Sequence, residues 1–86
     1  MMKVTMYGSH LCPDTLYAIN ELAARKVKIE FKNLSGSMAD LKAFLPLREG
    51  NPMFDEPRAN GSIGIPYFIM EDGFTTLELD DVLARL

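Results

Sequence analysis

Cys12 is the residue of this chain best suited to covalent chemistry. It is the single cysteine of the 86-residue sequence, and Pro13 follows it directly. Proline is favoured in the first turn of a helix, so Cys12 is expected where a loop enters a helix. The free N–H groups of a helix N-terminus stabilise an anion, so a cysteine there is more readily a thiolate, the nucleophilic form of sulfur. The expected chemistry is nucleophilic attack by the sulfur.

The neighbours of Cys12 act in different directions. The carboxylate of Asp14 disfavours a second negative charge on the sulfur, whereas the hydroxyl of Thr15 is able to hydrogen-bond to it. His10 is a candidate proton acceptor, although a solvent-exposed loop histidine is the commoner case. A lone cysteine is also often a small buried hydrophobic residue. Its place before a proline at a helix start favours the nucleophile.

Composition excludes several classes of protein. The net charge of −3 and scattered basic residues disfavour nucleic acid as a partner. The 48% hydrophobic content excludes disorder, and no apolar run reaches the ~20 residues of a membrane-spanning helix. One cysteine and one histidine predict neither a disulfide framework nor a metal site. Residues 1–4 already enter a strand-like pattern without a signal peptide, so we expect a cytoplasmic protein without a membrane partner.

The hydrophobic pattern predicts a single α/β domain over residues 1–86. In chain order we expect a strand at 3–7, a helix from 13 to about 26, a strand at 27–32, a helix after Ser37 that Pro46 ends or kinks, strands at 65–70 and 74–77, and a helix over 80–86. The helical crossover between the first two strands favours their parallel pairing, and the later two form a hairpin. The order β-α-β-α-β-β-α indicates a compact sandwich.

The segment from Arg48 to Ser62 is the least regular part of the chain, because it holds several glycines and prolines. We expect mobility there, with one helical turn near 51–59. Arg48 and Arg58 in this segment are either exposed to solvent or free to bind a carboxylate, which a guanidinium matches with paired hydrogen bonds.

Three short motifs follow one another along the chain: Cys12-Pro13-Asp14-Thr15 after a strand, Gly64-Ile65-Pro66-Tyr67-Phe68, and the acidic pair Asp80-Asp81. With the element order, they resemble the glutaredoxins of the thioredoxin-like superfamily. The resemblance implies a thioredoxin-like (glutaredoxin-type) sandwich with a mixed four-stranded sheet. It also implies a cis bond before Pro66, with the backbone of Ile65 facing the cysteine. Glutathione would be the co-substrate, its γ-glutamyl end held by Asp80 and Asp81.

The sequence departs from this family at several places, and two of them bear directly on glutathione chemistry. Thr15 stands where dithiol glutaredoxins have their second cysteine, so the resemblance implies monothiol chemistry in which a second thiol releases each adduct. Leu77-Glu78-Leu79 stands where the family places paired glycines, which alters the expected cradle for the γ-glutamyl carboxylate.

We therefore expect a monothiol glutaredoxin-like thiol-disulfide oxidoreductase that acts through Cys12 on glutathione mixed disulfides of proteins or small molecules. No tightly bound cofactor is expected. Two alternatives remain open. One is a non-catalytic thioredoxin-fold module that binds a thiol or peptide ligand. The other is a dimer that bridges an iron–sulfur cluster through two copies of Cys12 and two glutathiones.

Overall fold

Apolar residues that alternate along the strands build a sheet with two buried faces. In a computed structural model that describes residues 2–86, β1 (Lys3–Gly8) pairs in parallel with β2 (Lys28–Asn33) and antiparallel with β3 (Tyr67–Met70). β4 (Thr75–Thr76) pairs antiparallel with β3, which gives a mixed four-stranded sheet of order β2-β1-β3-β4. Met1, with which the expected strand-like start begins, lies outside the described residues.

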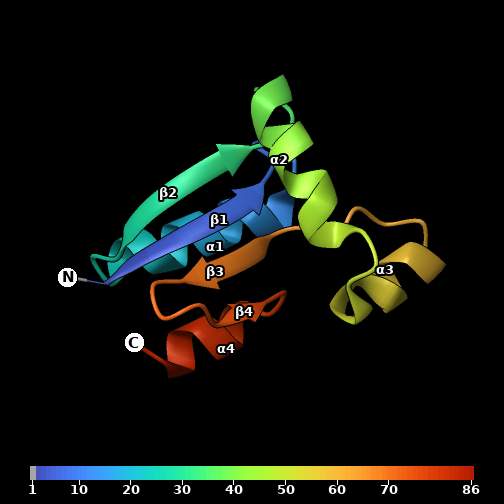
Figure 1. The fold of residues 1–86 in the computed structure, drawn as a ribbon. Helices are drawn as coiled ribbons and strands as arrows, with labels where there is room; N and C mark the ends of the chain where they lie inside the picture. The colour runs from blue at the N-terminus through green and yellow to red at the C-terminus, as the bar shows by residue number, and fades with distance from the viewer. Residues whose placement is uncertain (1) are drawn as a thin grey trace.

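Helices cover the two faces of this sheet (Figure 1). They are α1 (Pro13–Ala24), α2 (Met38–Arg48), α3 (Asp55–Ala59) and α4 (Leu79–Ala84), with a 3₁₀ turn, η1 (Pro52–Phe54), before α3. One core joins the strands to α1 and α4 through Val4, Met6, Ala18, Leu22, Phe68, Met70 and Val82. On the opposite face, the aromatic residues Tyr7, Phe44, Phe54 and Tyr67 join the sheet to α2 and η1. The alternation of strand side chains thus divides the apolar residues between two layers.

The expected elements are all present, with differences at their ends. Of the two outcomes expected at Pro46, an end or a kink of the helix, the first is wrong, because α2 continues to Arg48. The N–H of Glu49 still donates to the carbonyl of Leu45 at 2.9 Å, so the proline removes only the bond that its own nitrogen would make. β3 begins at Tyr67 rather than at residue 65, since Pro66 has no N–H to donate to a ladder.

The segment between α2 and β3 is more organised than the sequence predicts. Phe54 is fully buried, and its ring centroid lies 5.8 Å from that of Phe44 and 5.1 Å from that of Tyr67. Gly64 has a φ of +89°, and a Cβ at this position would lie 2.6 Å from the Phe54 ring. The buried ring therefore brings the segment that precedes β3 against the end of the sheet.

No helix in residues 2–86 is long and apolar enough to span a membrane. At the opposite end of the sheet from α3, Glu30 of β2 accepts from Lys3 and Lys32, each at 2.9 Å. These two ammonium groups lower the pKa of Glu30 to about 2.

Substitution of Gly64 tests the close contact with Phe54. We expect Gly64→Ala to lower the free energy of unfolding by about 2–4 kcal/mol, because alanine resists the positive φ and its methyl group meets the ring. Gly61 also has a positive φ, of +73°, but open space around it, so Gly61→Ala should cost only about 1 kcal/mol. Denaturant unfolding measures both, and equal losses would contradict the contact.

Acid titration tests the charge pairs of Glu30. The pKa of about 2 in the folded chain lies below the ordinary value of 4.5, so the pairs stabilise the fold above pH 4.5. This contribution is lost as the pH falls toward 2. An NMR titration of the side-chain carboxyl should give the lowered value, and a midpoint near 4.5 would show that the pairs do not form.

Candidate functional site

Cys12 lies directly before the first residue of α1, as the sequence predicts. Its backbone is extended, with φ −99° and ψ 118°. Its N–H donates to the carbonyl of Ser9 at 3.0 Å, and its carbonyl accepts from the N–H of Leu16 at 3.1 Å. The residue is partly exposed, and within residues 2–86 its sulfur takes part in no hydrogen bond. The sulfur therefore stands at a helix N-terminus with access to solvent.

Thr15 has a structural role that the sequence does not predict. Its side chain is fully buried, and its hydroxyl oxygen accepts from the N–H of Ser9 at 3.3 Å. A Cβ added at Gly8 would lie 2.7 Å from both Oγ1 and Cγ2 of Thr15. The expected hydrogen bond from Thr15 to the sulfur is thus replaced by a contact that joins α1 to the end of β1.

The loop that carries Cys12 is fastened to the end of β2. The hydroxyls of Ser9 and Ser35 lie 2.5 Å apart. His10 lies beside Asn33, with its N–H 3.4 Å from the amide oxygen and its Nδ1 2.9 Å from the amide nitrogen. His10 is exposed and its ring is engaged by Asn33, so its alternative role as a partner of the Cys12 sulfur receives no support.

The sulfur-bearing loop opens into a groove of about 490 Å³, here called the Cys12 groove. Its lining is Ser9, Leu11, Cys12, Leu34, Ser35, Gly61, Ser62, Ile63, Gly64 and Ile65. The Ile65–Pro66 peptide bond is cis, as the motif predicts. In the described part of the chain, neither the N–H nor the carbonyl of Ile65 makes a backbone hydrogen bond. Cys12 and the predicted Ile65 therefore share a groove in which an unpaired stretch of backbone is available.

Three of the other predicted residues, Asp14, Pro66 and Asp80, line a second groove, of about 310 Å³, between the starts of α1 and α4. Its lining is Asp14, Tyr17, Ile65, Pro66, Leu77, Glu78, Leu79 and Asp80, and we call it the α1–α4 groove. Asp80 is exposed in it. Ile65 borders this groove as well as the Cys12 groove, so the two meet at that residue.

The acidic pair is divided between two roles. Whereas Asp80 lines the α1–α4 groove, Asp81 accepts a hydrogen bond from the hydroxyl of Thr76 at 2.6 Å. The same hydroxyl oxygen accepts from the N–H of Glu78 at 3.0 Å. Asp81 thus stabilises the turn into α4, and Asp80 is the member of the pair left for a ligand.

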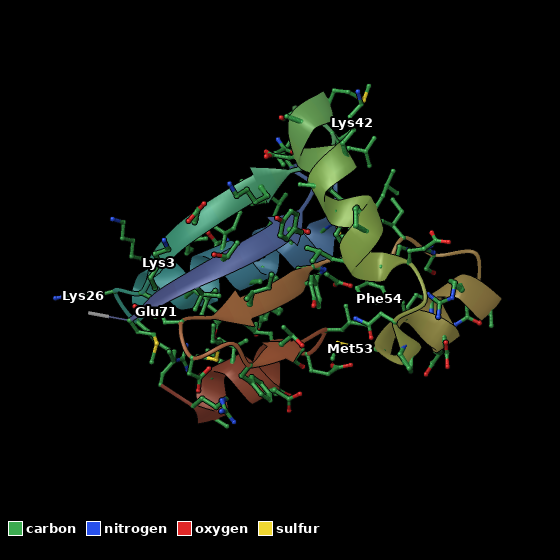
Figure 2. All side chains as sticks on the ribbon, viewed as in Figure 1. Lys3, Lys26, Lys42, Met53, Phe54 and Glu71 are labelled. Atoms are coloured by element: carbon green, nitrogen blue, oxygen red, sulfur yellow. The ribbon has the colours of Figure 1, made fainter. Side chains whose placement is uncertain are left out.

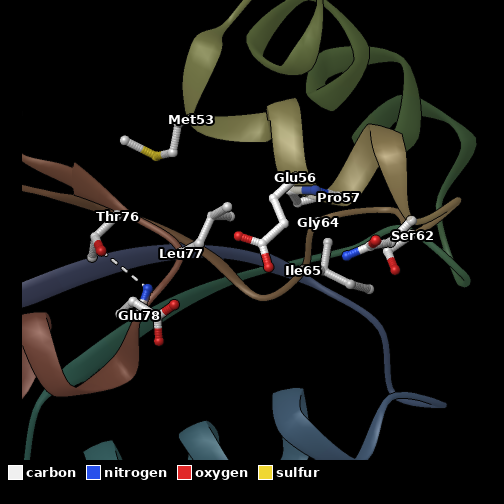
Figure 3. A pocket seen from close by; sticks show the side chains of 10 residues that line it. Met53, Glu56, Pro57, Ser62, Gly64, Ile65, Thr76, Leu77 and Glu78 are labelled. Atoms are coloured by element: carbon white, nitrogen blue, oxygen red, sulfur yellow. Dashed lines mark hydrogen bonds between the residues drawn. The ribbon is translucent and has the colours of Figure 1, made fainter.

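A third groove, of about 420 Å³, lies between α3 and the turn after β4 (Figure 3). This α3 groove is lined by Met53, Glu56, Pro57, Asn60, Ser62, Gly64, Ile65, Thr76, Leu77 and Glu78. Glu56 and Ser62 of this groove are not predictable from the sequence, because a stretch rich in glycine and proline carries no periodic signal. Pro52 before Phe54, and the acids Asp55 and Glu56, were the local signs of a short helix.

Arg48 and Arg58 are only partly exposed, and neither guanidinium is free to bind the carboxylate of a ligand. Arg48 donates to the carbonyls of Ile63 and Ser62 at 2.8 and 3.0 Å. Arg58 donates to the carbonyls of Arg48 and Asn51, both at 2.9 Å, and also forms an ion pair with Asp55. Arg48 thus holds Ser62 and Ile63, which line the Cys12 groove, and Arg58 joins α3 to the end of α2.

Replacement of the buried Thr15 hydroxyl tests its structural role. We expect Thr15→Val to lower the free energy of unfolding by about 1–3 kcal/mol, because the Ser9 N–H loses its acceptor. The Ser9 amide should also exchange faster with solvent. Thr75→Val, on the edge strand, is the matched control and should stay within about 0.5 kcal/mol. Unchanged stability and unchanged exchange in Thr15→Val would contradict the role.

Residues 2–86 contain no group of three or more histidine, cysteine, aspartate or glutamate side chains arranged to hold a metal ion. No protein-family model matches the sequence, and no solved structure does. An uncharacterized protein of Haemophilus influenzae is 33% identical over 79 residues, which make up 92% of each of the two chains. Identity at this level over nearly the whole length of both proteins means that the chain belongs to the same family as this Haemophilus influenzae protein.

Proposed function

We propose that this protein is a cytoplasmic monothiol oxidoreductase of the glutaredoxin type, in which Cys12 reduces glutathione mixed disulfides. The observation that carries the proposal is the shared groove of Cys12 and Ile65. It combines a sulfur at a helix N-terminus with a backbone whose hydrogen-bonding groups are unpaired. A disulfide-bearing peptide would react with the sulfur and would bind to the unpaired backbone.

The fold is consistent with this proposal. The mixed sheet of order β2-β1-β3-β4, with α1 and α4 on one face and α2 on the other, agrees with the thioredoxin-like arrangement that the sequence motifs imply. In this arrangement the end of β1 and the start of β3 lie side by side, since Tyr7 pairs with Tyr67. The chain segments that follow β1 and precede β3 are therefore brought together, and these carry Cys12 and Ile65.

The proposed reaction is two successive thiol–disulfide exchanges. The Cys12 thiolate attacks the glutathione sulfur of a mixed disulfide, and that S–S bond breaks. The bonding electrons leave with the partner's sulfur, which takes a proton from solvent. A second glutathione thiolate then attacks the glutathione sulfur bound to Cys12, which releases the Cys12 thiolate and forms glutathione disulfide. The cycle thus begins and ends with the Cys12 sulfur at the start of α1.

The ligand would be held by strand addition. The free N–H and carbonyl of Ile65 are able to pair with the backbone of an extended thiol peptide, whose sulfur then meets Cys12 in the same groove. Asp80 borders the adjoining α1–α4 groove and is suited to accept the ammonium of a γ-glutamyl group. These two contacts would orient opposite parts of one glutathione molecule around Ile65.

The position of Thr15 favours a second candidate, a binding module that does not turn over. Its buried hydroxyl takes the place of a resolving thiol, so a partner captured by Cys12 cannot be released from within the chain. Such a module would use the same groove and the same Ile65 backbone as the enzyme.

Removal of the sulfur tests the enzymatic proposal. We expect Cys12→Ser to reduce the release of glutathione from a glutathionylated peptide to the rate without protein, because the hydroxyl is a poor nucleophile toward sulfur. Thr75→Ser, outside all three grooves, is the control and should retain native activity. The assay follows peptide and adduct masses over time in the presence of glutathione.

Full activity of Cys12→Ser would refute the proposed mechanism. A native protein that binds the glutathionylated peptide at Cys12 and Ile65, but does not release its thiol, would instead identify the binding module.

A further inference from the structure

The three grooves are adjoining parts of one surface. Ile65 lines all of them, Ser62 and Gly64 are shared by the Cys12 and α3 grooves, and Leu77 and Glu78 are shared by the α3 and α1–α4 grooves. A ligand longer than a tripeptide that reaches Cys12 would therefore extend along at least one of the two neighbouring grooves.

The charge on this surface has one sign. Its charged lining residues are Asp14, Glu56, Glu78 and Asp80, and no lysine, arginine or histidine of residues 2–86 lines any of the three grooves. In Figure 3 the carboxylate of Glu56 lies between Leu77 and Gly64, over the middle of the α3 groove. Four carboxylates around a neutral Cys12 groove attract a partner of positive charge.

These carboxylates are not neutralised within residues 2–86. None of the four takes part in a side-chain hydrogen bond or an ion pair of the described chain, whereas Glu21, Glu30, Asp55 and Asp72 each pair with lysine or arginine elsewhere. Lys3 and Lys26 lie at the end of the sheet opposite α3 (Figure 2). Arg48 and Arg58 donate to backbone carbonyls and line none of the three grooves, so the four carboxylates remain available to a partner.

Large apolar side chains stand exposed on the same surface. Leu11 is 73% exposed and Ile63 is 55% exposed, and both line the Cys12 groove. Tyr17, in the α1–α4 groove, is 61% exposed, and Met53 is exposed in the α3 groove. Apolar side chains close to unpaired charges are typical of surfaces that bind polypeptides.

We propose that the joined grooves form a docking surface for a basic polypeptide segment that carries the disulfide. Leu11 and Ile63 contact apolar side chains of the segment beside its disulfide, and its lysine or arginine residues face Glu56 and Glu78 of the α3 groove. The inference rests on the proposed function of Cys12 and names the substrate class, a glutathionylated basic protein. Acidic glutathionylated proteins would be repelled by the same charges.

Binding of two matched peptides tests the surface without any need for turnover. Each peptide holds one glutathionylated cysteine next to a leucine, with lysines at the flanking positions in one peptide and glutamates in the other. We expect Cys12→Ser protein to bind the lysine peptide at least about tenfold more tightly at low salt. The preference should shrink as salt is raised, because the charges are exposed and screened. Fluorescence anisotropy measures both affinities.

A double variant with a matched control locates the effect. In the Cys12→Ser background, Glu56→Gln with Glu78→Gln should reduce the preference by at least about threefold. Glu49→Gln with Glu71→Gln removes the same net charge outside the three grooves and should leave the preference unchanged. Figure 2 places Glu71 beside Lys3, far from the α3 groove.

The outcomes separate the docking surface from the enzyme. Equal affinity for the two peptides, tighter binding of the glutamate peptide, or equal effects of the two double variants would overturn the inference. The native protein is then mixed with the lysine peptide and the formation of the Cys12–glutathione adduct is followed by intact mass. Preferential binding of the lysine peptide without adduct formation would uphold the docking surface and refute the proposed function.

Discussion

The site depends on the contact between Gly8, at the end of β1, and Thr15, in the first turn of α1. A Cβ at Gly8 would lie 2.7 Å from two atoms of the threonine side chain, so only glycine lets strand and helix approach this closely. The Thr15 hydroxyl accepts the Ser9 N–H in the same contact. The loop from Ser9 to Cys12 therefore has a short, fixed course, and the sulfur stands at the helix N-terminus.

A second glycine contact builds the opposite side of the groove. Gly64 passes against the buried ring of Phe54 in a conformation with positive φ, and Arg48 holds the carbonyls of the two residues before it. The two sides are formed by segments far apart in the sequence. They meet because β1 and β3 pair antiparallel, which brings the residues after β1 next to the residues before β3.

Much of this arrangement follows from sequence patterns alone. Periodicity, proline positions and the family resemblance predict the helix start at Pro13, the parallel β1–β2 pair and the backbone of Ile65 near Cys12. The same patterns do not predict contacts between segments that lie far apart in the sequence. The helix continued past Pro46, and the burial of Thr15 and Phe54 depends on packing, which a local pattern does not specify. The division of the acidic pair depends on the hydroxyl of Thr76, four residues before Asp80.

The reactivity of Cys12 with glutathione disulfide is the most direct measure of the central claim. Intact mass spectrometry follows formation of a glutathione adduct on the native protein, and N-acetylcysteine at the same pH provides the rate of a simple thiol. We predict one adduct, formed faster than on the simple thiol and reversed by added glutathione, because the groove and the unpaired backbone of Ile65 hold the peptide beside the Cys12 sulfur. Adduct formation no faster than on the simple thiol would contradict a site built for thiol–disulfide exchange.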